Sequence, residues 1–91
     1  MLQLNNNRYE IGGIDALSLC EKYDTPIYVY DTAIMKRQYD KLVNAFSAKP
    51  PKIKFACKAL NNINVLKFFK QQGAGMDCVS IQEVWTGLKA G

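Results

Sequence analysis

Histidine is absent from this sequence of 91 residues. Its absence excludes Ser-His-Asp and Cys-His catalytic groups, imidazole metal ligands and a histidine general base. No apolar run approaches the roughly 20 residues that span a bilayer. Residues 1–7 also lack the basic and apolar regions of a signal peptide. We therefore expect a cytoplasmic protein without membrane association, whose chemistry depends on lysine, carboxylate, cysteine or a cofactor.

Cysteine is scarce, and no Cys-X-X-Cys pair occurs among Cys20, Cys57 and Cys78. An odd number of cysteines without paired spacing argues against a disulfide framework and against a structural zinc site. We expect three reduced, buried thiols and no bound metal.

Blocks of like charge are also missing, although the net charge is +4. A mild basic excess suits nucleic acid or any phosphate ligand. The lysines are spread along the chain, and no basic-aromatic interleaving of the kind that binds RNA appears. A small basic binding module therefore remains only a remote alternative, and we expect no nucleic-acid partner.

Short apolar runs alternate with helical patterns, which predicts parallel α/β units. In the first half we expect a strand at residues 8–11, a helix starting after Asp15, and a second strand at 27–30. A long helix should follow, capped by Asp31 or Thr32. Its buried stripe is predicted to consist of Met35, Tyr39, Leu42 and Phe46.

The second half repeats this alternation. Residues 53–58 and 76–79 are predicted strands, and between them a helix should start after Asn61 or Asn62 and end at glycines 73 and 75. Ser80 and Glu83 fit a capping box that opens a last helix. The apolar positions of that helix at helical spacing are Ile81, Val84, Trp85 and Leu88.

Lys58 is the residue most suggestive of chemistry, because it ends a predicted strand among apolar neighbours. Ligands bind at the carboxyl ends of strands in parallel α/β sheets and barrels. An amine held among apolar groups has a lowered pKa and becomes a nucleophile that forms a Schiff base with an aldehyde. A lysine whose ammonium reaches solvent at a strand end is an equally good interpretation of the pattern.

Asp77 follows Lys58 by one strand-helix-strand repeat, so the two residues can be neighbours at one end of the sheet. Asp77 would then hold the ammonium of Lys58 or orient a bound cofactor. A carboxylate that satisfies backbone amides near a helix start is at least as good an interpretation. For Glu83 the structural role in the capping box is favoured, and Cys57 is most simply a core residue.

Four segments together resemble a known family. Residues 54–62 (KFACKALNN), 73–84 (GAGMDCVSIQEV) and 87–91 (GLKAG) are similar to the start of the diaminopimelate decarboxylase family, and residues 25–31 (TPIYVYD) resemble its lead into the barrel. The motifs occur in the right order and at compatible spacings over about residues 14–91. Leu60 departs from the family, in which asparagine often follows Lys-Ala.

The resemblance implies an α/β fold, the N-terminal fragment of a (β/α)8 TIM barrel. Residues 1–24 would be a lead-in, and residues 25–91 the first βα units of a barrel that binds pyridoxal 5'-phosphate. Lys58 would carry the cofactor as an internal aldimine, Asp77 would be a nearby cofactor-binding acid, and Glu83 matches a further acidic position. The implied reaction is decarboxylation of meso-diaminopimelate to L-lysine by a homodimer with active sites at its interface.

Three alternatives remain open within this resemblance: another pyridoxal-phosphate decarboxylase, an amino-acid racemase, or a noncatalytic pyridoxal-phosphate carrier. A closed barrel needs roughly 250 residues, so the family's phosphate-binding and ring-stacking residues lie beyond Gly91. We expect the 91-residue chain alone to be inactive and to self-associate through its open sheet edge.

Overall fold

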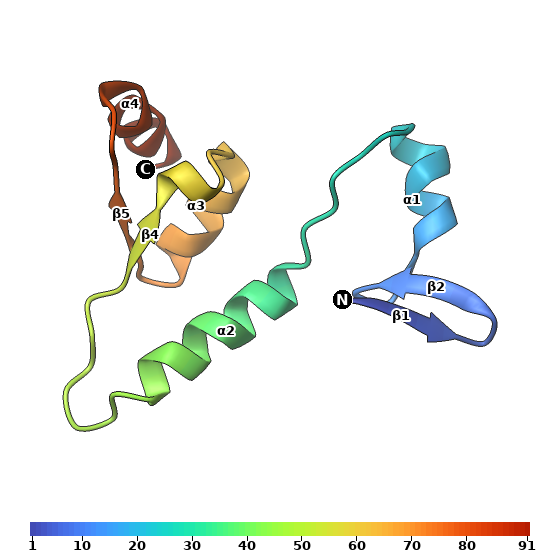
Figure 1. The fold of residues 1–91 in the computed structure, drawn as a ribbon, viewed down its shortest axis with the longest axis horizontal. Coiled ribbons are helices and arrows are strands. Elements are labelled where there is room, and N and C mark those ends of the chain that lie inside the picture. Colours follow the sequence, from blue (N-terminus) through green and yellow to red (C-terminus); the bar gives the residue numbers. More distant parts are fainter. The chain divides into compact units, whose positions relative to one another are not determined.

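The computed structural model describes residues 1–91, which form two compact units, Met1–Gln38 and Tyr39–Gly91. No helix of the structure has the length and apolar character needed to cross a membrane. The strands are β1 (Leu2–Asn5), β2 (Arg8–Ile11), β3 (Ile14–Asp15), β4 (Lys54–Ala56) and β5 (Gly75–Asp77). The helices are α1 (Ala16–Tyr23), α2 (Thr32–Asn44), α3 (Ile63–Gln71) and α4 (Ile81–Ala90), with a 3₁₀ turn at Cys57–Ala59 (Figure 1).

The first unit begins with an antiparallel sheet in the order β1-β2-β3. Only β2 was expected there. Asn6 and Asn7 both have positive φ, 47° and 61°, which suits the two-residue turn of a tight hairpin between β1 and β2. Helix α1 then starts where predicted, because the Asp15 side chain accepts a hydrogen bond from the Leu17 N–H at 3.2 Å.

The predicted strand at residues 27–30 is wrong, since no strand of the structure includes them. Apolar and β-branched residues favour an extended backbone, but a strand also needs a neighbour to accept its hydrogen bonds. The predicted cap of α2 is confirmed: Asp31 Oδ1 accepts hydrogen bonds from the Ala33 N–H at 2.9 Å and the Ile34 N–H at 3.3 Å. These bonds, with the nearby N-terminal ammonium, outweigh the effect of burial and hold the pKa of the Asp31 carboxyl below its ordinary value.

The stripe predicted for α2 is only partly correct. Met35 and Tyr39 are half-buried, whereas Leu42 and Phe46 are exposed. Helix α2 ends at Asn44, so Phe46 lies beyond the helix that was expected to present it. Helical periodicity identified the helix but not how far it extends.

The second unit contains a βαβα arrangement in which β4 and β5 pair in parallel (Figure 1). The register places Phe55 opposite Met76 and Ala56 opposite Asp77. Side chains alternate between the faces of a strand. The face that bears Phe55 and Met76 is covered by α3 and α4, and the face that bears Lys54 and Asp77 is exposed.

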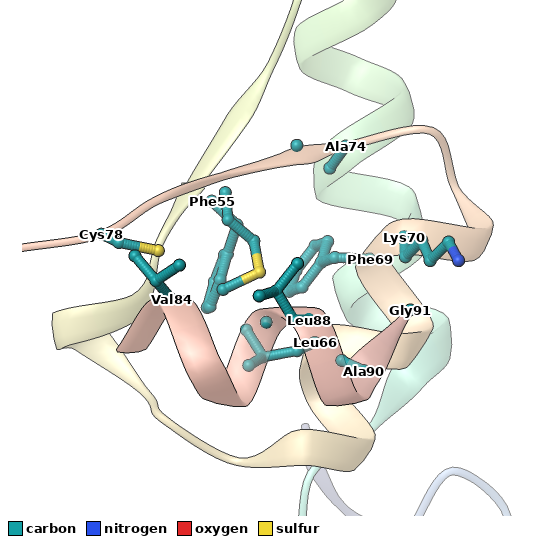
Figure 2. Close-up of a pocket in the computed structure, with 13 residues that line it drawn as sticks. Phe55, Leu66, Phe69, Lys70, Ala74, Cys78, Val84, Leu88, Ala90 and Gly91 are labelled. Atoms are coloured by element: carbon teal, nitrogen blue, oxygen red, sulfur yellow. The ribbon is translucent and has the colours of Figure 1, made fainter. Parts of the chain in front are cut away.

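The buried apolar core of this unit is small and consists of Cys57, Val65 and Leu66. Around it, the rings of Phe55 and Phe69 stack with their centroids 4.5 Å apart. An apolar cavity of about 320 Å³ lies beside these rings (Figure 2). Its lining includes side chains from both strands and both helices: Phe55, Leu66, Phe69, Met76, Val84 and Leu88.

Both ends of α3 follow the predicted signals. Asn62 is the N-cap, and its side chain accepts hydrogen bonds from the Asn64 and Val65 N–H groups. At the other end Gly73 has φ +92°. The Gly73 N–H donates to the Lys70 carbonyl and the Ala74 N–H donates to the Phe69 carbonyl, the two bonds of a Schellman motif.

The face of helix α4 that meets the sheet is not the face that bears its large apolar side chains. Ile81, Val84, Trp85 and Leu88 are all exposed, Trp85 by 62%, although Val84 and Leu88 also border the cavity. The more buried positions are Glu83, Thr86, Gly87 and Ala90. Small side chains on this face let α4 approach the sheet closely, because a Cβ on Gly87 would collide with the Met76 sulfur.

Candidate active site

Lys58 lies just past the carboxyl end of β4, in the 3₁₀ turn Cys57–Ala59. The strand is thus shorter than the predicted residues 53–58, and Lys58 follows it rather than ending it. Its side chain is exposed and makes no hydrogen bond or ion pair within the chain. Of the two interpretations of Lys58, the exposed side chain agrees with an ammonium that reaches solvent at a strand end, because the apolar neighbours Phe55 and Cys57 face the helices instead.

Asp77 is the last residue of β5 and lies directly opposite Ala56 in the parallel register. Since Lys58 follows Ala56 by two residues, Lys58 and Asp77 lie at the same end of the two-stranded sheet. Asp77 is exposed, and no ion pair joins it to Lys58. The sheet therefore brings the two residues to one end, while the role of Asp77 toward the ammonium stays a prediction.

This end of the sheet has the chemistry that an aldehyde cofactor requires. The Lys58 amine is accessible and unpaired, and a primary amine condenses with an aldehyde. The Asp77 carboxylate at the same edge supplies a negative charge for a cationic or hydrogen-bonding group of the ligand. The residues present thus fit pyridoxal phosphate. The apolar cavity of Figure 2 includes neither Lys58 nor Asp77, so it belongs to the packing between sheet and helices.

The structure only partly confirms the capping box at α4. Ser80 Oγ accepts a hydrogen bond from the Glu83 N–H at 3.2 Å, as predicted. The Glu83 carboxylate, however, accepts from the Val79 N–H at 2.8 Å, one residue before the expected Ser80 N–H. Glu83 is 9% exposed, and its side chain therefore both satisfies a backbone donor and lies inside the protein.

Cys57 and Cys78 lie side by side on the helix-facing side of the sheet, with their sulfur atoms 3.9 Å apart. Cys57 is completely buried, which confirms the prediction that it is a core residue. Burial raises the pKa of the Cys57 thiol to about 11, with further contributions from Cys78 and from the negative charges of Glu83 and Asp77. Cys57 is therefore a protonated thiol at neutral pH.

A known protein family matches the part of the chain that bears Lys58 and Asp77. Residues 32–91 match the family described as pyridoxal-dependent decarboxylase, pyridoxal binding domain. The chain belongs to this family. The matched residues include β4, β5 and the strand ends that bear Lys58 and Asp77.

Curated relatives of the chain are named diaminopimelate decarboxylase. The protein of Methanothermobacter thermautotrophicus is 40% identical over 83 residues, which cover 89% of this chain and 19% of the relative. The protein of Bacillus subtilis is 36% identical over 91 residues, which cover 98% of this chain and 21% of the relative. The chain thus spans about a fifth of the length of these relatives.

Solved structures that resemble this chain are also named diaminopimelate decarboxylase. The crystal structure of diaminopimelate decarboxylase from M. jannaschii in co-complex with L-lysine matches 99% of this chain and 22% of its own chain, with a TM-score of 0.91 and 28% identity. The match confirms the predicted fold class, the N-terminal part of a (β/α)8 barrel. The division into a lead-in of residues 1–24 and barrel units at residues 25–91 stays a prediction.

Cys57 and Glu83 were predicted to have separate structural roles, and the meeting of both with Cys78 was not predicted. Cys57 and Cys78 are 21 residues apart, the same offset that pairs Ala56 with Asp77. The repeat length that placed Lys58 near Asp77 predicts this thiol pair equally well. Cys-X-X-Cys spacing does not reveal such a pair, because that spacing brings cysteines together within one turn rather than across two strands.

Proposed function

We propose that this chain supplies the cofactor-bearing strand of a pyridoxal-phosphate-dependent diaminopimelate decarboxylase, which converts meso-diaminopimelate to L-lysine. The observation that carries the proposal is the accessible Lys58 amine at the carboxyl end of β4, with Asp77 at the same end of the neighbouring parallel strand. The family to which the chain belongs and the names of its relatives support the cofactor and the substrate. A homodimeric, cytoplasmic enzyme is part of the same proposal.

In this function Lys58 holds the cofactor covalently through its amine, and Asp77 carries the negative charge at the edge of the cofactor site. Pyridoxal phosphate, when bound, would supply the electron sink for the electron pair that stays on the substrate as CO₂ leaves. A Lys58 amine freed by substrate is then placed to hold a proton and return it near the reacting carbon. The strand end fixes Lys58 by backbone geometry, because the 3₁₀ turn is closed by the Leu60 N–H donating to the Cys57 carbonyl at 3.1 Å.

Borohydride reduction of the full-length enzyme tests the role of Lys58. We expect a stable cofactor adduct on the peptide that contains Lys58, and its loss in Lys58→Ala together with at least roughly a 100-fold fall in decarboxylation. Lys54→Ala is the matched control, since Lys54 is an exposed lysine at the other end of the same strand. An adduct on another lysine, or full activity of Lys58→Ala, would contradict the assignment.

The substrate is tested separately with the same protein. We expect CO₂ release from meso-diaminopimelate with formation of L-lysine, and no comparable release from ornithine or arginine. Racemised alanine without CO₂ release would support a racemase instead. A Lys58 adduct with no turnover of any amino acid would support a noncatalytic carrier, and would leave the cofactor assignment intact while overturning the decarboxylase.

A further inference from the structure

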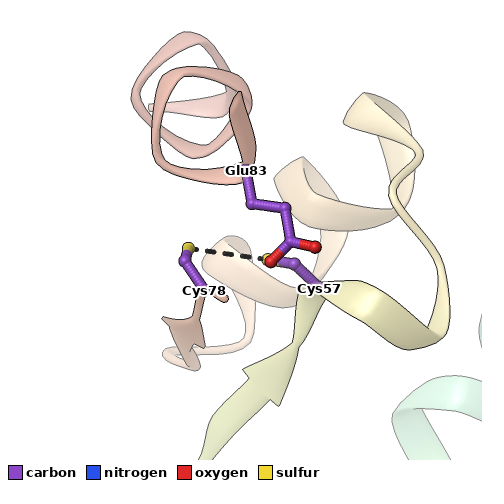
Figure 3. Close-up of side chains that lie close together, drawn as sticks. All are labelled: Cys57, Cys78 and Glu83. Atoms are coloured by element: carbon purple, nitrogen blue, oxygen red, sulfur yellow. Dashed lines mark hydrogen bonds between the residues drawn. The ribbon is translucent and has the colours of Figure 1, made fainter. Parts of the chain in front are cut away.

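Three side chains of types that bind metals meet on the helix-covered side of the sheet, on the opposite face from Lys58 and Asp77. The sulfur atoms of Cys57 and Cys78 and a carboxylate oxygen of Glu83 all lie within 4.8 Å of one another. Figure 3 shows the Glu83 side chain reaching from the start of α4 toward the two thiols. The three residues come from the 3₁₀ turn after β4, the segment after β5 and the first turn of α4. Two of the three residues, Cys57 and Glu83, lie in a 3₁₀ turn and a helix, and Cys78 directly follows β5.

From this geometry we infer that Cys57, Cys78 and Glu83 form a site for a thiophilic divalent cation, of which zinc is the best fit. Zinc bound tetrahedrally at about 2.3 Å from each sulfur separates two thiolates by about 3.8 Å. The observed distance between the two sulfur atoms is 3.9 Å. The thiols thus already have the separation of two ligands of one tetrahedral ion, and a disulfide would require them to move to about 2.05 Å.

The surroundings of Glu83 also suit its role as a metal ligand. Its Oε2 accepts a hydrogen bond from the Val79 N–H at 2.8 Å, which orients the carboxylate as the outer hydrogen bonds of metal ligands do. Two thiolates and a carboxylate around one zinc ion carry a net negative charge. The N-terminus of α4, where Ser80 and Glu83 lie, favours negative charge through the helix dipole. The fourth ligand of the ion would be water, because the three residues leave one tetrahedral position open.

Metal binding at this site exchanges thiol protons for the metal ion. Metal binding replaces the thiol protons, so both protons leave to solvent as the two metal–sulfur bonds form and no oxidant is needed. Affinity should consequently rise with pH.

The test uses the full-length protein, reduced and freed of metal with a chelator, and cobalt(II) as a spectroscopic probe that zinc displaces. We expect one equivalent of cobalt to give the intense bands of tetrahedral coordination in the red part of the spectrum, where pyridoxal phosphate does not absorb. Cys57→Ser and Cys78→Ser should each weaken binding more than about 100-fold, beyond the loss typical of outer-shell partners. Glu83→Gln should weaken it less than either cysteine substitution, because the glutamine side-chain oxygen remains a neutral ligand atom. Cys20→Ser, at the third cysteine of these 91 residues, should leave it unchanged.

X-ray absorption at the zinc edge tests the site in the unmodified protein, so the outcome does not depend on whether the variants fold. We expect two sulfur scatterers at about 2.3 Å. A shell without sulfur, binding that persists in Cys57→Ala/Cys78→Ala, or a metal-free protein in which both thiols have formed a disulfide would each overturn the inference. None of these measurements needs turnover, so the inference stands or falls separately from the proposed function.

Discussion

At the scale of single residues, the two faces of one short strand pair carry different chemistry. Lys58 and Asp77 are exposed at the strand ends, whereas Cys57 and Cys78 lie on the helix-covered face. A shift of one residue in the register would exchange the faces, because side chains alternate along a strand. The position of the amine is therefore set by the packing of the apolar face, above all by Phe55 on Phe69.

The buried thiol of Cys57 predicts a loss of stability in alkaline solution. Its pKa is raised to about 11 in the folded protein, above the value of about 8.5 of a free thiol. As the pH rises, the Cys57 thiol therefore loses its proton at a lower pH in the unfolded state than in the folded state. The contribution of Cys57 to the free energy of unfolding is complete below pH about 8.5 and is lost as the pH rises toward 11. We expect the melting temperature of the metal-free, full-length protein to fall over this range.

Lysine and tyrosine residues also titrate in alkaline solution, so the measured quantity is the difference between the wild type and Cys57→Ala. The variant should be less stable at neutral pH because it leaves a cavity, but its melting temperature should decline less between pH about 8.5 and 11. Parallel declines of the melting temperature in the two proteins would show that Cys57 does not contribute to the loss of stability in alkaline solution.

At the scale of elements, helix ends were predictable and helix faces were not. Asp15, Asp31, Asn62 and Ser80 each cap the helix expected of them, because capping depends on a few adjacent residues. Which face of α4 meets the sheet depends on packing: Gly87 and Ala90 lie there and allow a close approach, whereas Trp85 is exposed. The unpaired segment at residues 27–30 was misassigned for a similar reason, since pairing depends on a neighbour distant in sequence.

The candidate site, too, was predicted only in part from the sequence. Lys58 and Asp77 were found from repeat length and motif, and both lie at the predicted end of the sheet. The exposure of Lys58 and the meeting of Cys57, Cys78 and Glu83 depend on side-chain packing among three elements, which periodicity does not encode. The sequence therefore predicted the two residues at the strand ends, but not the cluster of Cys57, Cys78 and Glu83 on the helix-covered face.

The Schellman motif that ends α3 predicts a specific cost for Gly73→Ala. Gly73 has φ +92°, a conformation in which a Cβ is disfavoured, and the turn directs the chain from α3 into β5. We expect the substitution to lower the free energy of unfolding by about 1 kcal/mol. Chemical denaturation of the full-length protein measures the change, and Gly73→Asn should cost less because asparagine tolerates this region. Equal stability of Gly73→Ala would show that the turn can relax.

At the scale of the whole molecule, these 91 residues expose much of the surface that a barrel would bury. Only Cys57, Val65 and Leu66 are buried apolar residues, while large apolar side chains such as Trp85 and Leu88 are exposed. The sheet of β4 and β5 has two strands, so each strand also has one edge of unpaired backbone groups. Unpaired edges and large exposed apolar patches favour association with other chains.

We therefore expect the 91-residue chain, produced alone, to self-associate and to lack decarboxylase activity. Sedimentation velocity over a range of concentrations measures the association. Replacing Trp85 and Leu88 with lysine should reduce it by removing exposed apolar area. Gln82→Lys is the matched control, because it adds charge at an exposed position of the same helix and leaves the apolar surface in place. A monomer that melts cooperatively would show instead that the small core and the four capped helices suffice for an independent fold.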